Sequence, residues 1–350
     1  MMKKVTIQEI ADFTGVSKFA VSRALSGKSG VSTHTREMII RTAGQLGYFK
    51  DQGRTAHLDV QPPEEGTRKD NKAILVLFPN VRYQNMESVY WGPVFNGISS
   101  RLNQKGIDII TLTEPTADSM FSLLNPQAIG GIITVGSVST QVLLDIRQLN
   151  IPVMMVDHLD PAFQCDMIFS DNLHCIREIM MNLIRLGCKS FQFVGPIKDA
   201  HSFNERWLGF RSTLIDCGLE QHQIPELVEG ENEDIKSALT SAAAGGKLPE
   251  VLVCINDWMA EYVIDILKEV GVEVPADVQV TGFDNTHPHR PILATVNVNK
   301  EQLGRRAVDQ LLWRMHNPQS NYEKILVQAD VLIKDRFLAS SVTGTGARES

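Results

Sequence analysis

The sequence predicts a small all-α head followed by a large α/β body built from two doubly wound parallel-sheet lobes. The first 48 residues hold three short segments with apolar side chains at helical spacing. After residue 72, apolar strands alternate with amphipathic helices, which is typical of parallel sheets covered on both faces. A length of 350 residues allows two or three domains. We predict a head over 1–48, a linker over 49–72, a body over 73–340 and a disordered tail over 341–350.

Charge is divided unevenly between these parts. Residues 1–58 hold nine Lys and Arg against four Asp and Glu, a net charge of +5, whereas the whole chain carries −7 and the remainder therefore −12. A basic head on an acidic body suits a module that binds the phosphates of nucleic acid. Charge scatter over a short segment is the alternative.

The first helix of the head begins at a predicted capping box. The Thr6 hydroxyl and the Glu9 side chain can each satisfy a free backbone N–H group there. Gly15 then allows a tight turn, Ser17 can cap a second helix, and Ser32 opens a third. The side chains that these helices turn inward are apolar and helically spaced: Ile7, Ile10, Ala11, Val21, Ala24, Leu25, Met38, Ile39, Ala43 and Leu46.

Three helices of this length, with a glycine in the first turn, match the helix-turn-helix plan, in which the second helix enters a major groove. On that helix Arg23 can donate two hydrogen bonds to a guanine edge, and Phe19 can contact only an apolar group such as a thymine methyl. Lys18 can contact a base or a phosphate. Contacts that position the helix on the DNA backbone are expected from Ser17, Ser22, Thr35 and Arg36. A three-helix bundle with a solvated face is the alternative.

An ordered set of residues runs through the head: Val5-Thr6-Ile7, Ile10-Ala11, Gly15-Val16-Ser17, Val21-Ser22-Arg23, Val31-Ser32, Thr35-Arg36 and Gly47-Tyr48. This set resembles the N-terminal signature of the LacI/GalR family of transcriptional regulators. The resemblance implies a protein that binds an operator in double-stranded DNA.

In the body, apolar runs predict seven buried strands, over 73–78, 107–112, 129–135, 152–156, 191–194, 251–255 and 278–283. Amphipathic helices lie between them, such as those over 94–102 and 259–270. Because these strands are too many for one small sheet, we predict two lobes. The first spans about 73–161 with a returning segment near 299–320, and the second spans about 162–296 with the C-terminal segment. Ligands of such folds bind beyond the carboxyl ends of the strands, where two facing lobes form a cleft.

Polar residues stand at several of these strand ends. Asp157, Asn256 and Asp284 each follow a predicted strand, and Arg206 begins a helical segment. Carboxylates, an amide and an arginine in one cleft suit a polyhydroxylated ligand, because each hydroxyl needs both a donor and an acceptor. Helix capping is the alternative for any one of them, and it applies most to Asp257, which follows Asn256.

The aromatic pair Tyr90 and Trp91 can supply a wall for a sugar ring, and packing in the core is equally compatible with the pattern.

The body carries a second ordered set: Gly131-Ile132-Ile133, Ile151-Pro152-Val153, Ser170-Asp171-Asn172, Gly209-Phe210, Asn256-Asp257, Val274-Pro275, Gly282-Phe283-Asp284-Asn285, Thr295-Val296 and Gly304-Arg305-Arg306-Ala307. It is similar to the sensor domain of the same family, and the match runs from about residue 5 to about residue 340. The resemblance implies a fold like that of type I periplasmic sugar-binding proteins. It also implies that Asp157, Arg206, Asn256 and Asp284 contact the effector.

The linker departs from this resemblance. The family places an Ala-x-x-Leu helix after the head, whose leucines insert into the minor groove. Here Lys50 replaces the usual proline, Gly53 weakens a helix, and Ala56 and Leu58 have the wrong spacing. Leu58 remains a candidate DNA contact. We predict a head that is more loosely coupled to the body than is typical.

Other classes of protein are disfavoured. The five cysteines never form a CxxC pair, so we expect small buried hydrophobes and neither a disulfide frame nor a zinc site. His287 and His289 lack a third ligand, and we expect no metal, no cofactor and no catalytic residue. No Gly-x-Ser-x-Gly, phosphate loop or His-Glu-x-x-His motif is present. Without a signal peptide or an uninterrupted apolar span, we expect a cytoplasmic, nucleoid-associated protein.

We therefore predict a sequence-specific repressor, and no enzyme, whose operator affinity is controlled by a sugar or sugar derivative. A nucleobase or a protein partner as the effector is the first alternative, and a transporter's sugar-binding protein or an enzyme is the second. The tail lacks leucine heptads, so a homodimer on a palindromic operator is expected.

Overall fold

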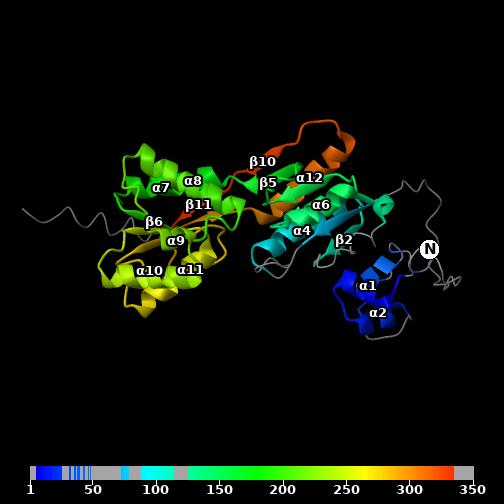
Figure 1. The fold of residues 1–350 in the computed structure, drawn as a ribbon, viewed down its shortest axis with the longest axis horizontal. Helices are drawn as coiled ribbons and strands as arrows, with labels where there is room; N and C mark the ends of the chain where they lie inside the picture. The colour runs from blue at the N-terminus through cyan, green and yellow to red at the C-terminus, as the bar shows by residue number, and fades with distance from the viewer. Residues whose placement is uncertain are drawn as a thin grey trace, which may run out of the picture. The chain divides into compact units, whose positions relative to one another are not determined.

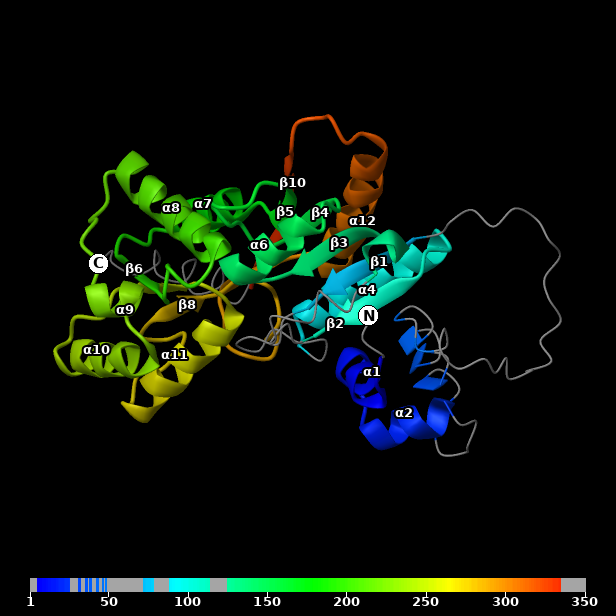
Figure 2. The same ribbon diagram turned by 45° about the vertical axis from the view of Figure 1, so that its right-hand side comes forward.

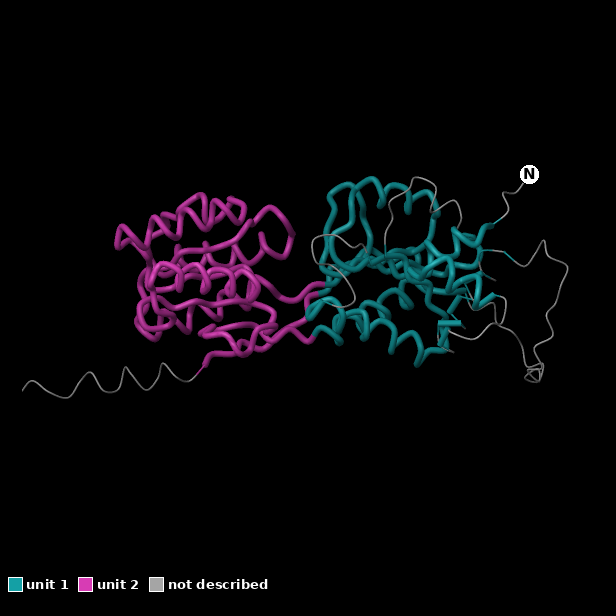
Figure 3. Tube along the Cα trace, turned by 90° about the horizontal axis from the view of Figure 1, so that it is seen from below, with its two compact units in different colours: residues 1–168, 300–325 teal, residues 169–299, 326–350 magenta. Residues whose placement is uncertain are grey.

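The computed structural model describes residues 5–25, 31–32, 35–36, 38–39, 42–43, 46, 48, 72–78, 88–113 and 125–334. The chain divides into two compact units (Figure 3). Unit 1 comprises residues 1–168 and 300–325, and unit 2 comprises residues 169–299 and 326–350. The chain passes from one unit to the other after residues 168, 299 and 325. The lobe boundaries predicted from the sequence stay predictions.

The head begins with two short helices, α1 (Ile7–Thr14) and α2 (Lys18–Leu25), drawn in blue in Figure 1. The predicted capping box is present: Thr6 Oγ1 accepts a hydrogen bond from Glu9 N at 3.3 Å, and Glu9 Oε2 accepts one from Thr6 N at 2.7 Å. Gly15 ends α1 in the left-handed region, at φ 65°. The Ser17 hydroxyl accepts a hydrogen bond from Ala20 N at 3.2 Å and so caps α2.

A third helical segment completes the core of the head. Residues 35–36, 38–39 and 42–43 are helical, and they pack on the buried sides of α1 and α2. The fully packed side chains are small or branched: Ile10, Ala11, Val21, Ala24, Ile39 and Ala43. The described residues therefore confirm the all-α head.

Unit 1 of the body is built on a sheet with the strand order β10-β5-β4-β3-β1-β2. Its strands are β1 (Ala73–Leu77), β2 (Ile109–Leu112), β3 (Ile129–Val135), β4 (Val153–Val156), β5 (Asp166–Ser170) and β10 (Lys324–Val327). The β1–β2, β1–β3, β3–β4 and β4–β5 pairs are parallel. Helices α4 (Trp91–Gln104), α6 (Thr140–Gln148) and α12 (Lys300–His316) and the 3-10 turn η1 (Pro126–Ala128) complete it.

Two glycines allow α4 and α12 to touch along their backbones. A Cβ added to Gly97 would lie 2.1 Å from the carbonyl oxygen of Glu301, and one added to Gly304 would lie 2.1 Å from that of Val94. A larger residue at either position would push the two helices apart. This contact holds together two segments that are about 200 positions apart in the sequence.

Unit 2 holds a sheet with the order β11-β9-β8-β7-β6. Its strands are β6 (Phe191–Val194), β7 (Val251–Cys254), β8 (Gln279–Thr281), β9 (Ala294–Asn297) and β11 (Asp330–Ile333), and only β11 is antiparallel to its neighbour. Helices α7 (Asn172–Arg185) and α8 (His201–Asp216) cover one face (Figures 1 and 2). Helices α9 (Pro225–Glu229), α10 (Asn232–Ala244) and α11 (Asp257–Glu269) cover the other. Two parallel-sheet α/β units confirm the predicted fold class.

All seven predicted strands are present, with ends within two residues of those expected. Strands β5, β9, β10 and β11 were not predicted. In β10 and β11 half-buried and exposed residues alternate, so these strands contain no continuous apolar run. Strand β5 has only three consecutive apolar residues, which lie between the buried Asp166 and Ser170. It therefore lacks the long apolar run from which a strand is predicted.

The five cysteines are free thiols. Burial raises the pKa of Cys165 to about 12 and that of Cys175 to about 11, so both stay protonated at neutral pH. The predicted burial is confirmed for Cys165, Cys175 and Cys254, whereas Cys188 and Cys217 are half-buried. Within the described residues, no helix is both long enough and apolar enough to span a bilayer.

A buried ion pair fastens the start of β5 to the start of β10. Arg314 donates through Nε to Asp166 Oδ2 at 2.7 Å and through Nη2 to Oδ1 at 2.8 Å, and the two side chains are 4% and 0% exposed. Asp166 Oδ1 also accepts a hydrogen bond from Glu323 N at 2.8 Å. The same guanidinium donates to three carbonyls of the loop between α12 and β10, those of Asn317, Ser320 and Asn321. The two strands lie at crossings between the units, so this pair anchors both of them in unit 1.

Replacing Arg314 by methionine leaves the Asp166 carboxylate buried without its cation. We expect the free energy of unfolding to fall by about 3–5 kcal/mol, measured by urea denaturation. Arg177→Met is the matched control, because Arg177 pairs with Asp216 at the surface, and it is expected to lose less than about 1 kcal/mol. Equal losses in the two variants would contradict this account of the buried pair.

Candidate functional site

The outer face of α2 carries the side chains predicted to contact DNA. Lys18, Phe19 and Ser22 are exposed, and Arg23 is half-buried. The guanidinium carbon of Arg23 lies 5.3 Å from the centre of the Phe19 ring. Because Val21 and Ala24 point into the core of the head, the helix presents cationic, hydroxyl and aromatic groups on one side.

Thr35 and Arg36, also predicted to contact DNA, lie at helix ends. Ser32 Oγ accepts a hydrogen bond from Thr35 N at 3.1 Å and caps the third helical segment. Arg36 Nη1 donates to the carbonyl oxygens of Ala24 at 3.1 Å and Arg23 at 3.5 Å, at the end of α2. Their contact with the DNA backbone stays a prediction. Leu58, with the linker over 49–71 and the tail over 341–350, lies outside the described residues.

In unit 2, Arg206 is the centre of a buried polar cluster. It lies on α8 and is 2% exposed. All three guanidinium nitrogens donate hydrogen bonds: Nε to Asn172 Oδ1 at 3.0 Å, Nη1 to the Ile255 carbonyl at 2.6 Å and Nη2 to Asp284 Oδ1 at 3.3 Å. The guanidinium carbon lies 3.7 Å from the centre of the Phe283 ring. These contacts hold the arginine in one orientation.

A second carboxylate continues this cluster on α8. Glu205 Oε2 accepts a hydrogen bond from Asn172 Nδ2 at 3.0 Å, and Glu205 Oε1 lies 3.1 Å from His201 Nε2. Asn172 therefore accepts from Arg206 and donates to Glu205, which determines which way its amide faces. The cluster supplies donors and acceptors side by side, the combination that hydroxyl groups require.

The loop after β8 is held by Asp257. Asp284 and Asn285 both have positive φ, at 93° and 48°, a conformation that needs support from surrounding structure. Asp257 Oδ2 accepts from Thr286 N at 2.8 Å and His287 N at 3.3 Å. Burial raises the pKa of the Asp257 carboxyl above its ordinary value.

Two further contacts fix Asp257. Its Oδ1 accepts a hydrogen bond from Thr295 Oγ1 at 2.7 Å. A Cβ at Gly282 would lie 2.1 Å from the same oxygen, so only glycine leaves room for this carboxylate. Asp257 is thus a support for the loop that carries Asp284.

The predicted effector residues divide between the units. Arg206 and Asp284 are brought together in unit 2, whereas Asn256 caps α11 by accepting a hydrogen bond from Met259 N at 2.8 Å. In unit 1, Asp157 follows β4 with a positive φ of 53°. The effector role of these residues stays a prediction.

The aromatic pair of unit 1 lies at the start of α4. Tyr90 and Trp91 pack edge to face, with ring centres 4.7 Å apart, and both are half-buried. Lys300 Nζ lies 5.7 Å from the centre of the Tyr90 ring. Their role in a sugar-binding wall stays a prediction.

Sequence reasoning did not find Asn172, Glu205 or His201 as parts of the Arg206 cluster. Asn172 stands in the Ser170-Asp171-Asn172 motif of the sensor-domain resemblance, and that motif was a usable signal. Glu205 and His201 precede Arg206 by one and five positions on α8, and nothing local distinguishes them from surface residues. The contact between Glu205 and His201 lies within α8, and the contact between Glu205 and Asn172 arises only when α7 and α8 pack together.

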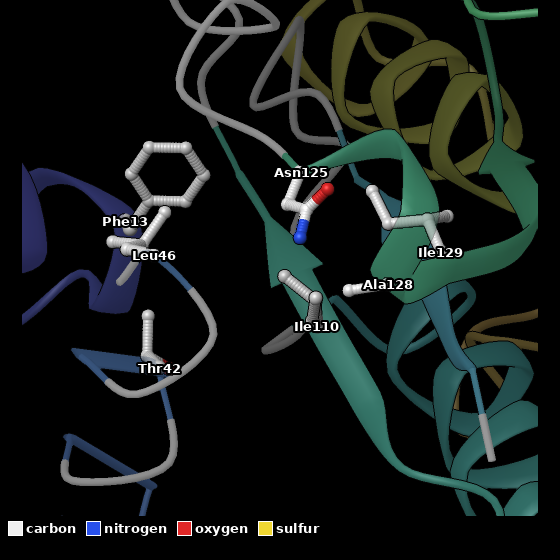
Figure 4. Close-up of a pocket in the computed structure, with 7 residues that line it drawn as sticks. All are labelled: Phe13, Thr42, Leu46, Ile110, Asn125, Ala128 and Ile129. Atoms are coloured by element: carbon white, nitrogen blue, oxygen red, sulfur yellow. The ribbon is translucent and has the colours of Figure 1, made fainter. Parts of the chain in front are cut away.

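Two pockets lie elsewhere in the described residues. Figure 4 shows a pocket of unit 1 lined mostly by apolar side chains: Phe13, Thr42, Leu46, Ile110, Asn125, Ala128 and Ile129. It has few partners for hydroxyl groups. A pocket of about 320 Å³ in unit 2 lies between the start of α7 and β11, with Asp171, His174 and Glu178 in its wall. No cluster of three metal-binding side chains occurs in the described part of the chain.

Comparison with family models gives two matches. Residues 6–51 match the model of bacterial regulatory proteins of the lacI family, and residues 181–335 match that of the periplasmic binding protein-like domain. The first covers the head with its exposed α2 face, and the second covers the Arg206 cluster apart from Asn172.

Among curated proteins, the chain is similar to the HTH-type transcriptional regulator GalR of Lacticaseibacillus casei, with 23% identity over 94% of this chain and 98% of that one. Among solved structures, it is similar to the transcriptional regulator CelR in its cellobiose complex, with a TM-score of 0.64, 21% identity and coverage of 94% and 99%. It is also similar to the lac repressor dimer bound to operator and the anti-inducer ONPF, with a TM-score of 0.59, 20% identity and coverage of 95% and 98%.

Replacing Asp257 by alanine removes the acceptor for two backbone N–H groups and one buried hydroxyl. Because buried donors left unsatisfied cost about 1–3 kcal/mol each, we expect a loss of several kcal/mol in stability. Hydrogen exchange at residues 284–287 should accelerate in the folded protein. Asp265→Ala is the control, since Asp265 lies on the same helix but is exposed and pairs with Arg290. Unchanged exchange in Asp257→Ala would show that the loop does not depend on this carboxylate.

Proposed function

Because the chain belongs to the LacI family of bacterial regulatory proteins, we propose that it is a repressor whose operator affinity is set by a small polyhydroxylated effector, a sugar or sugar derivative. Membership makes it a transcriptional regulator with a helix-turn-helix head and an effector-binding domain, and not an enzyme.

The exposed face of α2 supports DNA binding. Lys18 and Arg23 place positive charge on the face that a helix-turn-helix protein inserts into the major groove. Phe19 and Ser22 add an apolar and a hydroxyl contact on the same side. The head as a whole is basic, which favours association with phosphates. The protein therefore acts at the chromosome, in the cytoplasm of the cell.

The Arg206 cluster supports a polyhydroxylated effector. In unit 2, Arg206 is hydrogen-bonded to Asp284 and to Asn172, and Asn172 is hydrogen-bonded to Glu205. Asp284 follows β8, at the carboxyl end of a strand, where ligands of such sheets bind. Ligands with several hydroxyl groups bind where donors and acceptors alternate in this way. The relative CelR was solved with cellobiose, a disaccharide, which favours the same class of ligand here.

The effector acts through linkage. A ligand that binds the DNA-bound and free states with different affinity changes operator affinity by the same factor, typically a coupling of about 1–3 kcal/mol. We place the protein on its operator as a homodimer, because two copies of one head match the two halves of a palindromic site. The lac repressor was solved as a dimer bound to operator.

DNA binding is tested with Arg23→Ala. Duplexes enriched from a random library by the full chain are compared with scrambled duplexes at several salt concentrations. We expect the variant to lose about 10- to 100-fold in affinity for enriched duplexes and little for scrambled ones, because a bidentate guanine contact contributes about 1–3 kcal/mol of discrimination. Lys247→Ala, an exposed change in unit 2, is the control. Equal discrimination by wild type and Arg23→Ala would contradict the assignment of Arg23.

Effector binding is tested by thermal unfolding of the full chain with cellobiose, glucose, galactose, ribose and adenine. A ligand at 100 times its Kd should add about 2.7 kcal/mol to the stability. Arg206→Lys should abolish that shift, because lysine cannot keep three fixed hydrogen bonds. Arg177→Lys, at a half-buried position where the arginine pairs with Asp216, should keep it. A shift with adenine alone would favour a nucleobase effector, and a shift that survives Arg206→Lys would remove Arg206 from the site.

A further inference from the structure

Phe13 is buried, but it lies outside the core of the head. It stands on α1 and is only 5% exposed. The core of the head is formed by other side chains of its three helical segments, among them Ile10 and Val21. Phe13 packs instead in the hydrophobic cluster of the unit 1 sheet, which contains Ile110 and Ile129. The burial of Phe13 therefore comes from the body.

The contact has a second apolar member in the head. Leu46, which follows the third helical segment, packs against the same cluster of the body. Figure 4 shows the head residues Phe13, Thr42 and Leu46 opposite the body residues Ile110, Asn125, Ala128 and Ile129. The cavity between them is about 10 Å³, room for no more than about one water molecule. The two sides therefore form a contact between head and body, and not a site for a small ligand.

The body side of this contact lies at a sheet edge. Strand β2 is the last in the order of the unit 1 sheet, so among the described strands it has a neighbour on one side only. Helix α1 of the head lies against β2. Proteins often cover an edge strand with a helix, because its unpaired backbone groups can otherwise pair with another chain. The head thus occupies a position that the sheet leaves open.

The DNA-binding face of α2 stays accessible in this arrangement. Lys18, Phe19 and Ser22 are exposed in the same structure in which Phe13 is buried. The surface of the head is thereby divided between an apolar side on the body and a polar side left for DNA. A contact of this kind positions the head without masking it.

We propose that the head docks on the β2 edge of unit 1 through Phe13 and Leu46, and that this docking couples the position of the head to the body. Phe13 is then a positioning residue for operator binding and not a DNA contact. Because the linker sequence disfavours the hinge helix of the family, the docking contact gives the head a second attachment. The docking itself is independent of the proposed function, whereas its effect on DNA binding rests on the proposed homodimer.

Hydrogen exchange in the full chain tests the docking. Phe13→Ser removes the apolar ring, whose burial favours the docked state by about 10- to 100-fold. We expect the backbone amides of β2, residues 109–112, to exchange about 10-fold faster in this variant, because the strand edge becomes accessible to water. The amides of β4, which lies inside the sheet, should exchange at the wild-type rate.

A variant on the body side tests the same contact from its other partner. Ala128→Arg places a charged side chain in the contact and should accelerate exchange in β2 as Phe13→Ser does. Its control is Gln127→Arg, which adds the same charge at an exposed neighbouring position outside the contact. Gln8→Ser, at an exposed position of α1, is the control for Phe13→Ser. Circular dichroism checks that each variant keeps the helical head, whose core does not include Phe13.

The spacing of the two operator half-sites tests the effect on DNA binding. Docked heads keep a fixed separation in a homodimer, so duplexes enriched by the wild type from a random library should share one half-site spacing. Phe13→Ser should enrich the same half-site sequence at several spacings, because the base contacts come from α2. We expect its affinity for the wild-type duplex to fall about 10-fold, because the second head then binds at a lower effective concentration.

The outcomes separate the docking from its effect on DNA and from the proposed function. Wild-type exchange in β2 of either Phe13→Ser or Ala128→Arg overturns the docking. Faster exchange together with a single half-site spacing in Phe13→Ser overturns the positioning role. If the wild type enriches no duplex, the proposed function fails, and the exchange rates still decide whether the head is docked.

Discussion

The buried charge of Arg206 is the constraint on which unit 2 depends. An unpaired guanidinium in an apolar interior is too costly to keep, so the surrounding chain must bring acceptors to each of its nitrogens. Asn172 comes from α7, the Ile255 carbonyl from the end of β7, and Asp284 from the loop after β8. One side chain thereby sets the relative positions of three separate elements.

The position of Asp284 depends in turn on the conformation of the loop after β8. Asp284 can reach Arg206 only because the loop adopts positive φ at two successive residues, and Asp257 supports that conformation through its backbone contacts. Gly282 leaves the space that Asp257 occupies. The site that we propose for the effector is therefore part of the folded core and rests on rigid elements, which suits a ligand whose binding must alter the rest of the protein.

The positively charged side chains of unit 1 and of the head lie in different surroundings. In unit 1 a buried arginine is paired with one carboxylate, Asp166, and anchors strands where the chain crosses between units. In the head the cations stay at the surface of a small core, where they remain accessible to phosphates and bases. The two buried arginines, Arg206 and Arg314, thus organise the two units of the body.

Local patterns in the sequence determined most of the architecture. Capping at Thr6, helical spacing in the head and long apolar runs in the body each act over a few residues, and each was predictable. The alternating strands β10 and β11 were not, because their pairing depends on strands far away in the chain. The Asn256 cap is a local contact that the sequence offered as an alternative, whereas tertiary structure alone decided that Asp257 supports a loop and that Glu205 joins Arg206 through Asn172. A sequence pattern shows which groups are present, and only packing between distant elements decides which of them meet.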